Sequence, residues 1–294
     1  MTENEYLEAI LLQQTLAPGS PELNELQERG EEVKSLLRSK FGTARIREAG
    51  SKRKGTMVKA SYDLDLTCYF PHDDNSAGET LKEIFEGIEA ALREKYVTSP
   101  KGSAIRVWDA TGKTDFHIDV VPGRFVDGND GDVFLYRSSG DKERLKTNLN
   151  VHINHVRDSG VLDAIRLTKL WRERNGGNVK TFALELLVIK LLEKKRNEAL
   201  SEQLRHVWEQ FKEDGENLTI EDPANPSGND LSELLNDSVR FWLSSTATST
   251  IDAIEQSGWE AVFGDVEVSE SQRAEALRNI TVATPIRTKP WGNG

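Results

Sequence analysis

The sequence has one cysteine, Cys68, and five histidines among its 294 residues. A single cysteine excludes an internal disulfide, and we expect Cys68 to be a buried strand residue. The histidines are scattered, and His152 and His155, which have no second ligand pair beside them, are expected at the surface or as helix caps. These shortages leave little material for a zinc site, which is usually built from clustered cysteines and histidines.

Long apolar runs and an excess of basic residues are also missing. No run of about 18 apolar residues occurs, and the N-terminal sequence MTENEYLEAILLQQ carries acidic residues where a secretory signal begins with basic ones. We therefore expect a cytoplasmic protein without a membrane segment. The net charge of −11 disfavours an extensive nucleic-acid-binding surface. A local basic cleft remains compatible with that charge, because Lys52, Arg53, Lys54 and Lys59 cluster in the sequence.

What the sequence does contain is a globular composition, with 37% hydrophobic residues, six Trp and ten Phe. Strand-like alternation predicts strands at 44–50, 62–70, 104–110 and 115–125, and a hairpin region at 126–148 with its tip near Gly140-Asp141. Helical spacing predicts helices at 21–41, 77–95, 160–176, 179–197, 200–211, 231–245 and 268–277. We therefore predict an α+β fold, with a mixed half at residues 1–150 and a helical half at residues 151–294.

Acidic residues interrupt two of the predicted strands. Asp63 and Asp65 lie two positions apart in YDLDLTCYF, so their carboxylates point to one face at a separation of about 7 Å. Two such charges are costly side by side unless a cation lies between them, and Mg²⁺ is typically held by carboxylates together with substrate phosphates. Asp119, in the apolar stretch HIDVVP, is a third candidate ligand. His117 alternates with Asp119 on the same strand face and is expected near the metals.

The segment before Asp63 has the features of a phosphate-binding loop. Gly50 and Gly55 allow the backbone to approach a ligand, and Ser51 and Thr56 supply hydroxyl donors. With the basic Lys52, these residues are predicted to bind the nucleotide. Phosphate held by the loop would then meet metal held by the aspartates, as in two-metal nucleotidyl transfer.

The motif Gly-Ser-x-x-x-Gly-Thr followed by Asp-x-Asp, with a later Asp before Pro, resembles the polymerase-beta-like nucleotidyltransferase superfamily. The resemblance spans about residues 20–290 and implies a palm, made of a mixed sheet with helices, joined to a helical C-terminal lobe. The second half resembles the branch that contains oligoadenylate synthetases, cyclic GMP-AMP synthase and the bacterial CD-NTases of anti-phage signalling.

Three segments carry this narrower resemblance. IRLTKLWRERNG is similar to a helix that bears a triphosphate-contacting lysine, which implies this role for Lys169. VKTFALELLVIKLL is similar to a helix start that meets the nucleotide, which implies Lys180 and Thr181. IEDPANPSGND resembles the Asp-Pro-x-Asn-Pro-x-x-Asn signature of the helical lobe, which implies nucleotide contacts or a structural anchoring role for Asp222 and Asn225.

The resemblance implies an enzyme that joins NTPs, ATP among them, into a cyclic oligonucleotide second messenger in anti-phage (CBASS) signalling. It implies two Mg²⁺ ions, or Mn²⁺ in their place, on Asp63, Asp65 and Asp119, with Asp119 helping to deprotonate the attacking hydroxyl. It also implies regulatory protein partners from an anti-phage operon. No Cys-rich insertion like that of the animal DNA sensor is present, and the acidic charge argues against a long nucleic-acid activator.

Two other functions stay open at this point. One is template-independent RNA tailing of the CCA-adding type, which requires a basic tRNA-binding surface. The other is a non-catalytic nucleotide-binding scaffold, which would ordinarily have lost one of the three acids.

Overall fold

A computed structural model describes residues 1–108, 117–138 and 143–266. Within these ranges no helix is long and apolar enough to cross a membrane. The predicted hairpin tip at Gly140-Asp141 and the predicted helix at 268–277 fall outside the described residues.

Among the described residues, the first half is built on a seven-stranded sheet. Five strands have the order β1-β2-β5-β4-β3, while β6 pairs with β5 and β7 pairs with β6. The members of the sheet are β1 (Arg45–Glu48), β2 (Leu64–Phe70), β3 (Val97–Lys101), β4 (Ala104–Trp108), β5 (Ile118–Phe125), β6 (Val133–Tyr136) and β7 (Arg144–Thr147). Strands β2 and β5 are parallel, and the other pairs are antiparallel. The strand pattern of the sequence does not predict β3, which contains Pro100; proline is tolerated here because β3 lies at the sheet edge.

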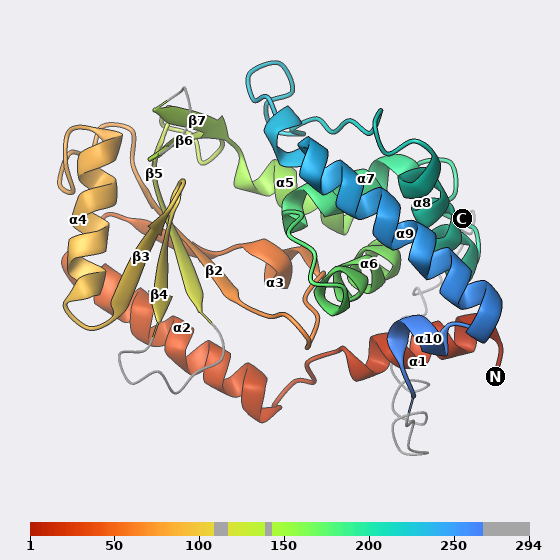
Figure 1. Cartoon of the computed structure of the whole chain (residues 1–294). Helices are drawn as coiled ribbons and strands as arrows, with labels where there is room; N and C mark the ends of the chain where they lie inside the picture. Colours follow the sequence, from red (N-terminus) through yellow and green to blue (C-terminus); the bar gives the residue numbers. More distant parts are fainter. Residues whose placement is uncertain (109–116, 139–142, 267–294) are drawn as a thin grey trace, which may run out of the picture.

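Two helices, α2 (Pro21–Lys40) and α4 (Leu81–Arg93), cover one face of this sheet (Figure 1). Ser20 caps α2 and Thr80 caps α4 through hydrogen bonds from backbone N–H groups. Their apolar faces pack against alternate residues of β2 in a common core. The intervening residues of β2, Asp65 among them, therefore point to the opposite face, toward the helical half.

The segment predicted as a phosphate-binding loop begins with a short helix, α3 (Gly50–Lys54). Gly55 ends it in the left-handed region, with φ of 78°, and donates its N–H to the Ser51 carbonyl. Local backbone hydrogen bonds therefore give a helical turn where the sequence predicts a loop.

The helical half contains α5 (Leu149–Arg157), α6 (Leu162–Arg174), α7 (Thr181–Leu191), α8 (Leu200–Glu213), the 3-10 turn η1 (Ser232–Leu235), α9 (Asp237–Ser257) and α10 (Glu260–Phe263). As predicted from its apolar sequence, α7 is buried, and every residue from Ala183 to Ile189 is shielded from solvent. The helix predicted at 231–245 is divided into η1 and α9, because Asn236 caps α9 from outside it.

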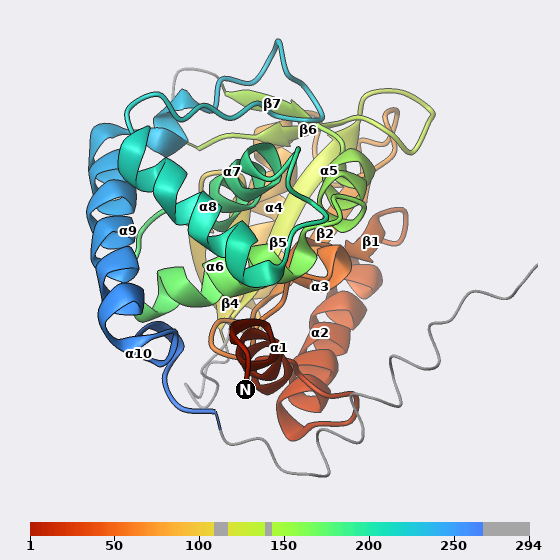
Figure 2. The same ribbon diagram turned by 90° about the vertical axis from the view of Figure 1, so that its right-hand side faces the viewer.

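One further helix, α1 (Glu3–Gln13), is not predicted from the sequence. Its residues Tyr6, Leu7, Ile10 and Leu11 belong to the core of the helical half, although they begin the chain. Figure 2 shows α1 beside α6, on the same side of the molecule as α10. The segment between α1 and α2 connects the helical half, to which α1 contributes, with the sheet half. The domain boundary near residue 150 stays a prediction.

Candidate active site

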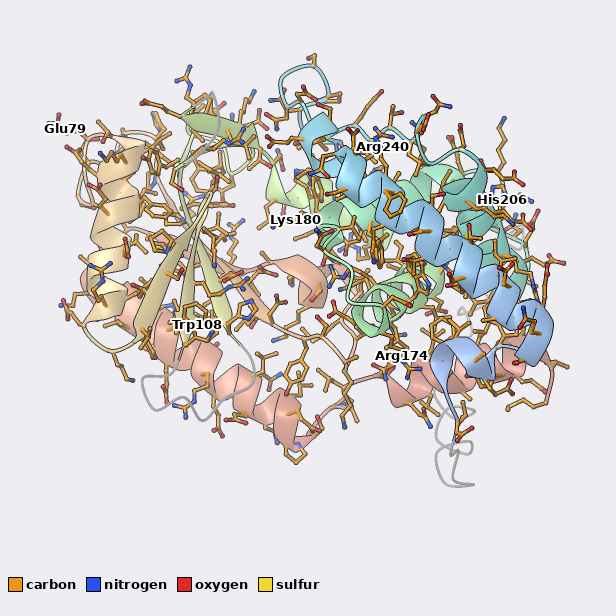
Figure 3. The ribbon with its side chains drawn as sticks, viewed as in Figure 1. Glu79, Trp108, Arg174, Lys180, His206 and Arg240 are labelled. Atoms are coloured by element: carbon orange, nitrogen blue, oxygen red, sulfur yellow. The ribbon has the colours of Figure 1, made fainter. Side chains whose placement is uncertain are left out.

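A cleft of about 1950 Å³ lies between the sheet and the helical half. This volume exceeds the 300–1,000 Å³ or so of a typical small-molecule pocket, so the cleft has room for more than one nucleotide. Nine of the predicted site residues line it: Gly50, Ser51, Asp63, Asp65, Lys169, Lys180, Thr181, Asp222 and Asn225. Figure 3 shows Lys180 on the side of the helical half that faces the sheet.

The remaining predicted residues lie near the cleft but do not line it. Lys52 forms an ion pair with Glu48 at 2.9 Å, and Gly55 ends α3. Thr56 is fully buried, and its hydroxyl donates a hydrogen bond within the protein. Asp119 lies behind the lining residues Arg106 and His117, with which it interacts.

The register of three adjacent strands aligns the acidic residues. Asp65 on β2 is the neighbour of Asp119 on β5, and Asp119 is the neighbour of Arg106 on β4. Asp63 immediately precedes β2. We refer to Arg106, Asp119 and Asp65 as the charged row. Because the three strands are consecutive in the sheet, the row crosses it at one level.

Arg106 distinguishes the two acids of the charged row. Burial of Asp119 opposes its ionisation, but hydrogen bonds from Arg106, at 2.9 and 2.8 Å, and interaction with His117 outweigh this and lower its pKa to about 2. Burial, together with repulsion from Asp63 and Asp119, raises the pKa of Asp65 to about 7. The positive charges of Lys54 and His117 offset only part of this rise in the pKa of Asp65.

The donor atoms fit a divalent cation. One ligand atom each from Asp63, His117 and Asp119 lie within 4.8 Å of one another. The Nε2 atom of His117 lies 3.5 Å from Asp63 and 3.6 Å from Asp119, and it makes no hydrogen bond to any described residue. Burial disfavours its charged form, yet the two carboxylates raise the pKa of His117 to about 9. Carboxylates that stabilise the positive charge of a protonated His117 can also stabilise a divalent cation, and Mg²⁺ and Mn²⁺ prefer carboxylate oxygens as ligands. His117 lies beside both acids, and its predicted place near the metals stays a prediction.

Gly50 lies so close to Asp65 that a side chain has no space there. Its φ is 58°, and an added Cβ would lie 1.5 Å from Oδ2 of Asp65. The next residue, Ser51, is among those that line the cleft, and its buried hydroxyl has no hydrogen-bond partner among the described residues. Burying a hydroxyl without a hydrogen-bond partner costs free energy, which indicates that a bound ligand supplies the missing partner.

A buried polar cluster joins this segment to the helical half. Glu185 of α7 accepts hydrogen bonds from Lys54, at 2.7 Å, and from Thr56, at 2.8 Å. Lys169 of α6 donates to the Thr56 carbonyl at 2.7 Å, and burial lowers the pKa of Lys169 to about 8. Lys169 thus supports the segment that follows α3. The role of Glu185 is not predicted from the sequence, although an acid in the apolar stretch ALELLV is a signal of the same kind as Asp119.

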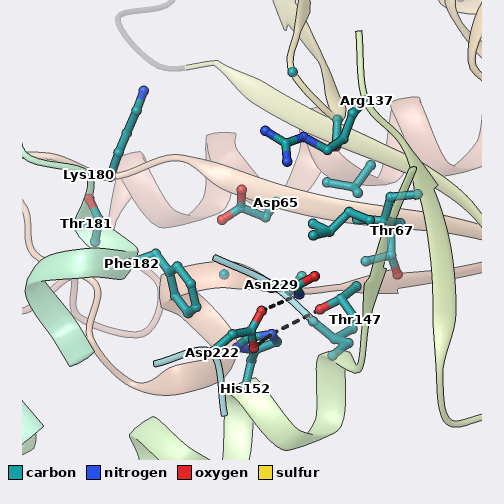
Figure 4. A pocket seen from close by; sticks show the side chains of 18 of the residues that line it. Asp65, Thr67, Arg137, Thr147, His152, Lys180, Thr181, Phe182, Asp222 and Asn229 are labelled. Atoms are coloured by element: carbon teal, nitrogen blue, oxygen red, sulfur yellow. Dashed lines mark hydrogen bonds and ion pairs between the residues drawn. The ribbon is translucent and has the colours of Figure 1, made fainter. Parts of the chain in front are cut away.

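The Asp-Pro-Ala-Asn-Pro segment closes another side of the cleft (Figure 4). Asp222 is buried and accepts hydrogen bonds from Asn229, at 2.7 Å, and from the Ala224 N–H, at 2.8 Å. Asn229 also donates to the Lys146 carbonyl, so the segment is anchored to the end of β7. The Asp222 carboxylate is therefore already engaged within the protein.

His152 is a member of the same cluster. Its Nε2 lies 3.3 Å from Asp222 and 3.0 Å from the Thr147 hydroxyl. The expectation that His152 is a surface or cap residue was wrong, because the fold brings the distant Asp222 against it. Its ring also contacts Phe182 edge-on, with 5.0 Å between centroids. Phe182, which the sequence analysis did not single out, gives the cleft an aromatic wall beside the predicted residues Lys180 and Thr181.

No protein-family model matches the sequence, and no curated protein matches it. Solved structures do match. CdnC from E. coli MS115-1, in a complex with HORMA-deltaN, aligns with a TM-score of 0.69 at 17% identity over 91% of this chain and 99% of that chain. CdnG from Bradyrhizobium diazoefficiens, a CD-NTase in complex with GTP, aligns with a TM-score of 0.67 at 14% identity, over 96% and 99%. The CdnE cyclic dinucleotide synthase from Elizabethkingia meningoseptica, with GTP and Apcpp, aligns with a TM-score of 0.61 at 17% identity, over 86% and 99%.

These alignments include nearly all of each solved chain and most of this one. At such identities the likeness establishes the fold. The predicted α+β architecture, a mixed sheet with helices joined to a helical half, is confirmed. In its fold, this chain is similar to the bacterial CD-NTases.

Proposed function

We propose that the protein is a metal-dependent nucleotidyltransferase that joins NTPs into a cyclic oligonucleotide. The observation that carries the proposal is the charged row beside the unpartnered Ser51 hydroxyl, in a cleft with room for two nucleotides. Support also comes from a solved relative in fold, a cyclic dinucleotide synthase with two different nucleotides, GTP and Apcpp.

In the proposed reaction, the hydroxyl of Ser51 binds a phosphate oxygen of the donor NTP. A ribose hydroxyl oxygen of the acceptor attacks the α-phosphorus, the bond to the β-phosphate oxygen breaks, and pyrophosphate leaves while the hydroxyl proton is released. Two Mg²⁺ or Mn²⁺ ions held by Asp63, Asp65 and Asp119 would activate the hydroxyl and neutralise the pyrophosphate. Both oxygens of Asp119 accept hydrogen bonds from Arg106, which favours the ionised carboxylate, so we assign Asp119 to holding cations. Its help in deprotonating the attacking hydroxyl stays a prediction.

The helical half contributes the rest of the proposed nucleotide site. Lys180 is placed to neutralise phosphate charge, and the ring of Phe182 offers a surface for a base. Lys169 and Asp222 are engaged within the protein, so we propose that they act by holding the cleft walls in place. We further propose a role in anti-phage signalling with a regulatory protein partner, since the CdnC structure is a complex with HORMA-deltaN.

The function is tested by incubating the purified protein with radiolabelled ATP, GTP, CTP and UTP, singly and together, with Mg²⁺ or Mn²⁺. Products are treated with phosphatase and separated by chromatography. A phosphatase-resistant, metal-dependent product of low molecular weight is expected, and omission of single NTPs identifies its bases. If label instead enters added tRNA and no small product forms, the enzyme is an RNA-tailing nucleotidyltransferase and the proposal is wrong.

Replacing Ser51 with alanine is expected to weaken nucleotide binding by about 1–2 kcal/mol, or roughly tenfold, the scale of one charge-assisted hydrogen bond. The measurement is calorimetric titration with a non-hydrolysable ATP analogue in the presence of Mg²⁺. Ser39→Ala is the matched control, because Ser39 is exposed on α2 and its hydroxyl donates only to the Leu36 carbonyl. Equal affinities for all three proteins would show that the Ser51 hydroxyl does not contact phosphate.

A further inference from the structure

Arg106 is the only cation of the charged row, and it is not among the residues that the sequence motifs single out. It lies on β4 directly opposite Asp119, so the sheet itself sets their separation. Nε of Arg106 donates to Oδ1 of Asp119 at 2.9 Å, and Nη2 donates to Oδ2 at 2.8 Å. Two parallel hydrogen bonds between planar groups fix the orientation of a carboxylate as well as its charge.

This arrangement leaves Asp119 able to bind a cation. Each carboxylate oxygen has two lone pairs, and the guanidinium occupies one on each oxygen. The remaining lone pair of Oδ2 is on the atom that lies 3.6 Å from His117 Nε2, within the group of possible metal ligands. The contact with Arg106 therefore leaves a lone pair on each oxygen of Asp119 for a cation.

We propose that Arg106 is a positioning residue, which orients Asp119 for the divalent cations and does not itself bind the triphosphate. The inference rests on the proposed function, because it assumes a cation at Asp63 and Asp119. The side-on pair of guanidinium donors, Nε–H and one Nη2–H, is engaged with Asp119, so this pair is not free to bind a phosphate. Groups that orient metal ligands typically change metal affinity or activity ten- to a hundredfold when they are replaced.

The deciding variant is Arg106→Lys, because lysine keeps the positive charge but cannot form the planar fork. We expect its affinity for Mn²⁺ to fall about tenfold or more, measured in the free protein from the electron paramagnetic resonance signal of unbound Mn²⁺. Asp119→Asn, which removes a proposed cation ligand, gives the Mn²⁺ affinity expected when the site is lost. Arg47→Lys is the matched control, since Arg47 on β1 forms an ion pair with Asp130 and does not line the cleft. Thermal melting verifies that each variant is folded.

Several outcomes would overturn the inference. Arg106→Lys could bind Mn²⁺ as tightly as the wild type, or Arg106→Met could bind it more tightly, as expected if the guanidinium only repels the ion. Arg106→Lys could also retain Mn²⁺ affinity while its KM for NTP rises, which would assign Arg106 to phosphate binding. A wild type that does not bind Mn²⁺ would overturn it as well. Because Mn²⁺ occupancy is measured without turnover, a protein that passes this test yet makes no product would contradict only the proposed function.

Discussion

Replacing Asp63 with asparagine is expected to abolish product formation while the protein stays folded. Asparagine has nearly the same shape, but it removes one of the negative charges that attract the cations. Metal ions stabilise the charge of such a transition state by several kcal/mol, so we expect the rate of product formation to fall at least about a thousandfold. The side chain of Asp63 is 37% exposed, and among the described residues its ion-pair partner is His117 alone. The melting temperature should therefore change little.

The matched control is Asp73→Asn. Asp73 follows β2 in the chain as Asp63 precedes it, but its side chain is 76% exposed and does not line the cleft. Both variants are assayed with labelled NTPs and followed by thermal melting. Wild-type rates in Asp63→Asn would remove this residue from the metal site, and a large loss in Asp73→Asn would show that the effect is not specific to the cleft.

Replacing Glu185 with leucine is expected to lower the free energy of unfolding by about 3–5 kcal/mol, because Lys54 and Lys169 would remain buried without their counter-charge. Glu185 is 1% exposed, and Lys169 is 3% exposed. The measurement is urea denaturation followed by tryptophan fluorescence. A loss below 1 kcal/mol would show that the lysines reach solvent and that Glu185 does not bind the two halves together.

The double variant Lys54→Met, Glu185→Leu tests the cause of that loss. Removing both charges of a buried pair is often close to neutral, so the double variant should be more stable than Glu185→Leu alone. Glu198→Leu is the control, because Glu198 pairs with Lys195 near the surface, where an ion pair contributes about 0–1 kcal/mol. A double variant less stable than either single one would contradict the buried-charge account.

The candidate acids were predictable because strand periodicity is local. Asp63 and Asp65 are two positions apart, and Asp119 interrupts an apolar strand, so each can be recognised without knowing the fold. That the three acids lie close together in the fold is harder to predict from the sequence. The alignment of Asp65 with Asp119 depends on the parallel pairing of β2 with β5, which is set by the whole sheet.

Residues whose importance comes from a distant partner could not be predicted. Arg106 contacts Asp119 only because β4 pairs with β5, and His152 contacts Asp222 only because the fold brings two distant segments together. Neither contact can be recognised from the local sequence. The placement of α1 has the same explanation. Its apolar residues can be read from the sequence, but the choice of the helical half as their partner is decided by tertiary packing.

The most direct test of the central claim is a crystal structure with Mn²⁺ and a non-hydrolysable ATP analogue, with Mn²⁺ located by its anomalous scattering. The account predicts manganese bound by the carboxylates of Asp63, Asp65 and Asp119, with a triphosphate oxygen at hydrogen-bond distance from Ser51 Oγ. Manganese bound elsewhere, or a triphosphate that does not reach Ser51, would contradict it.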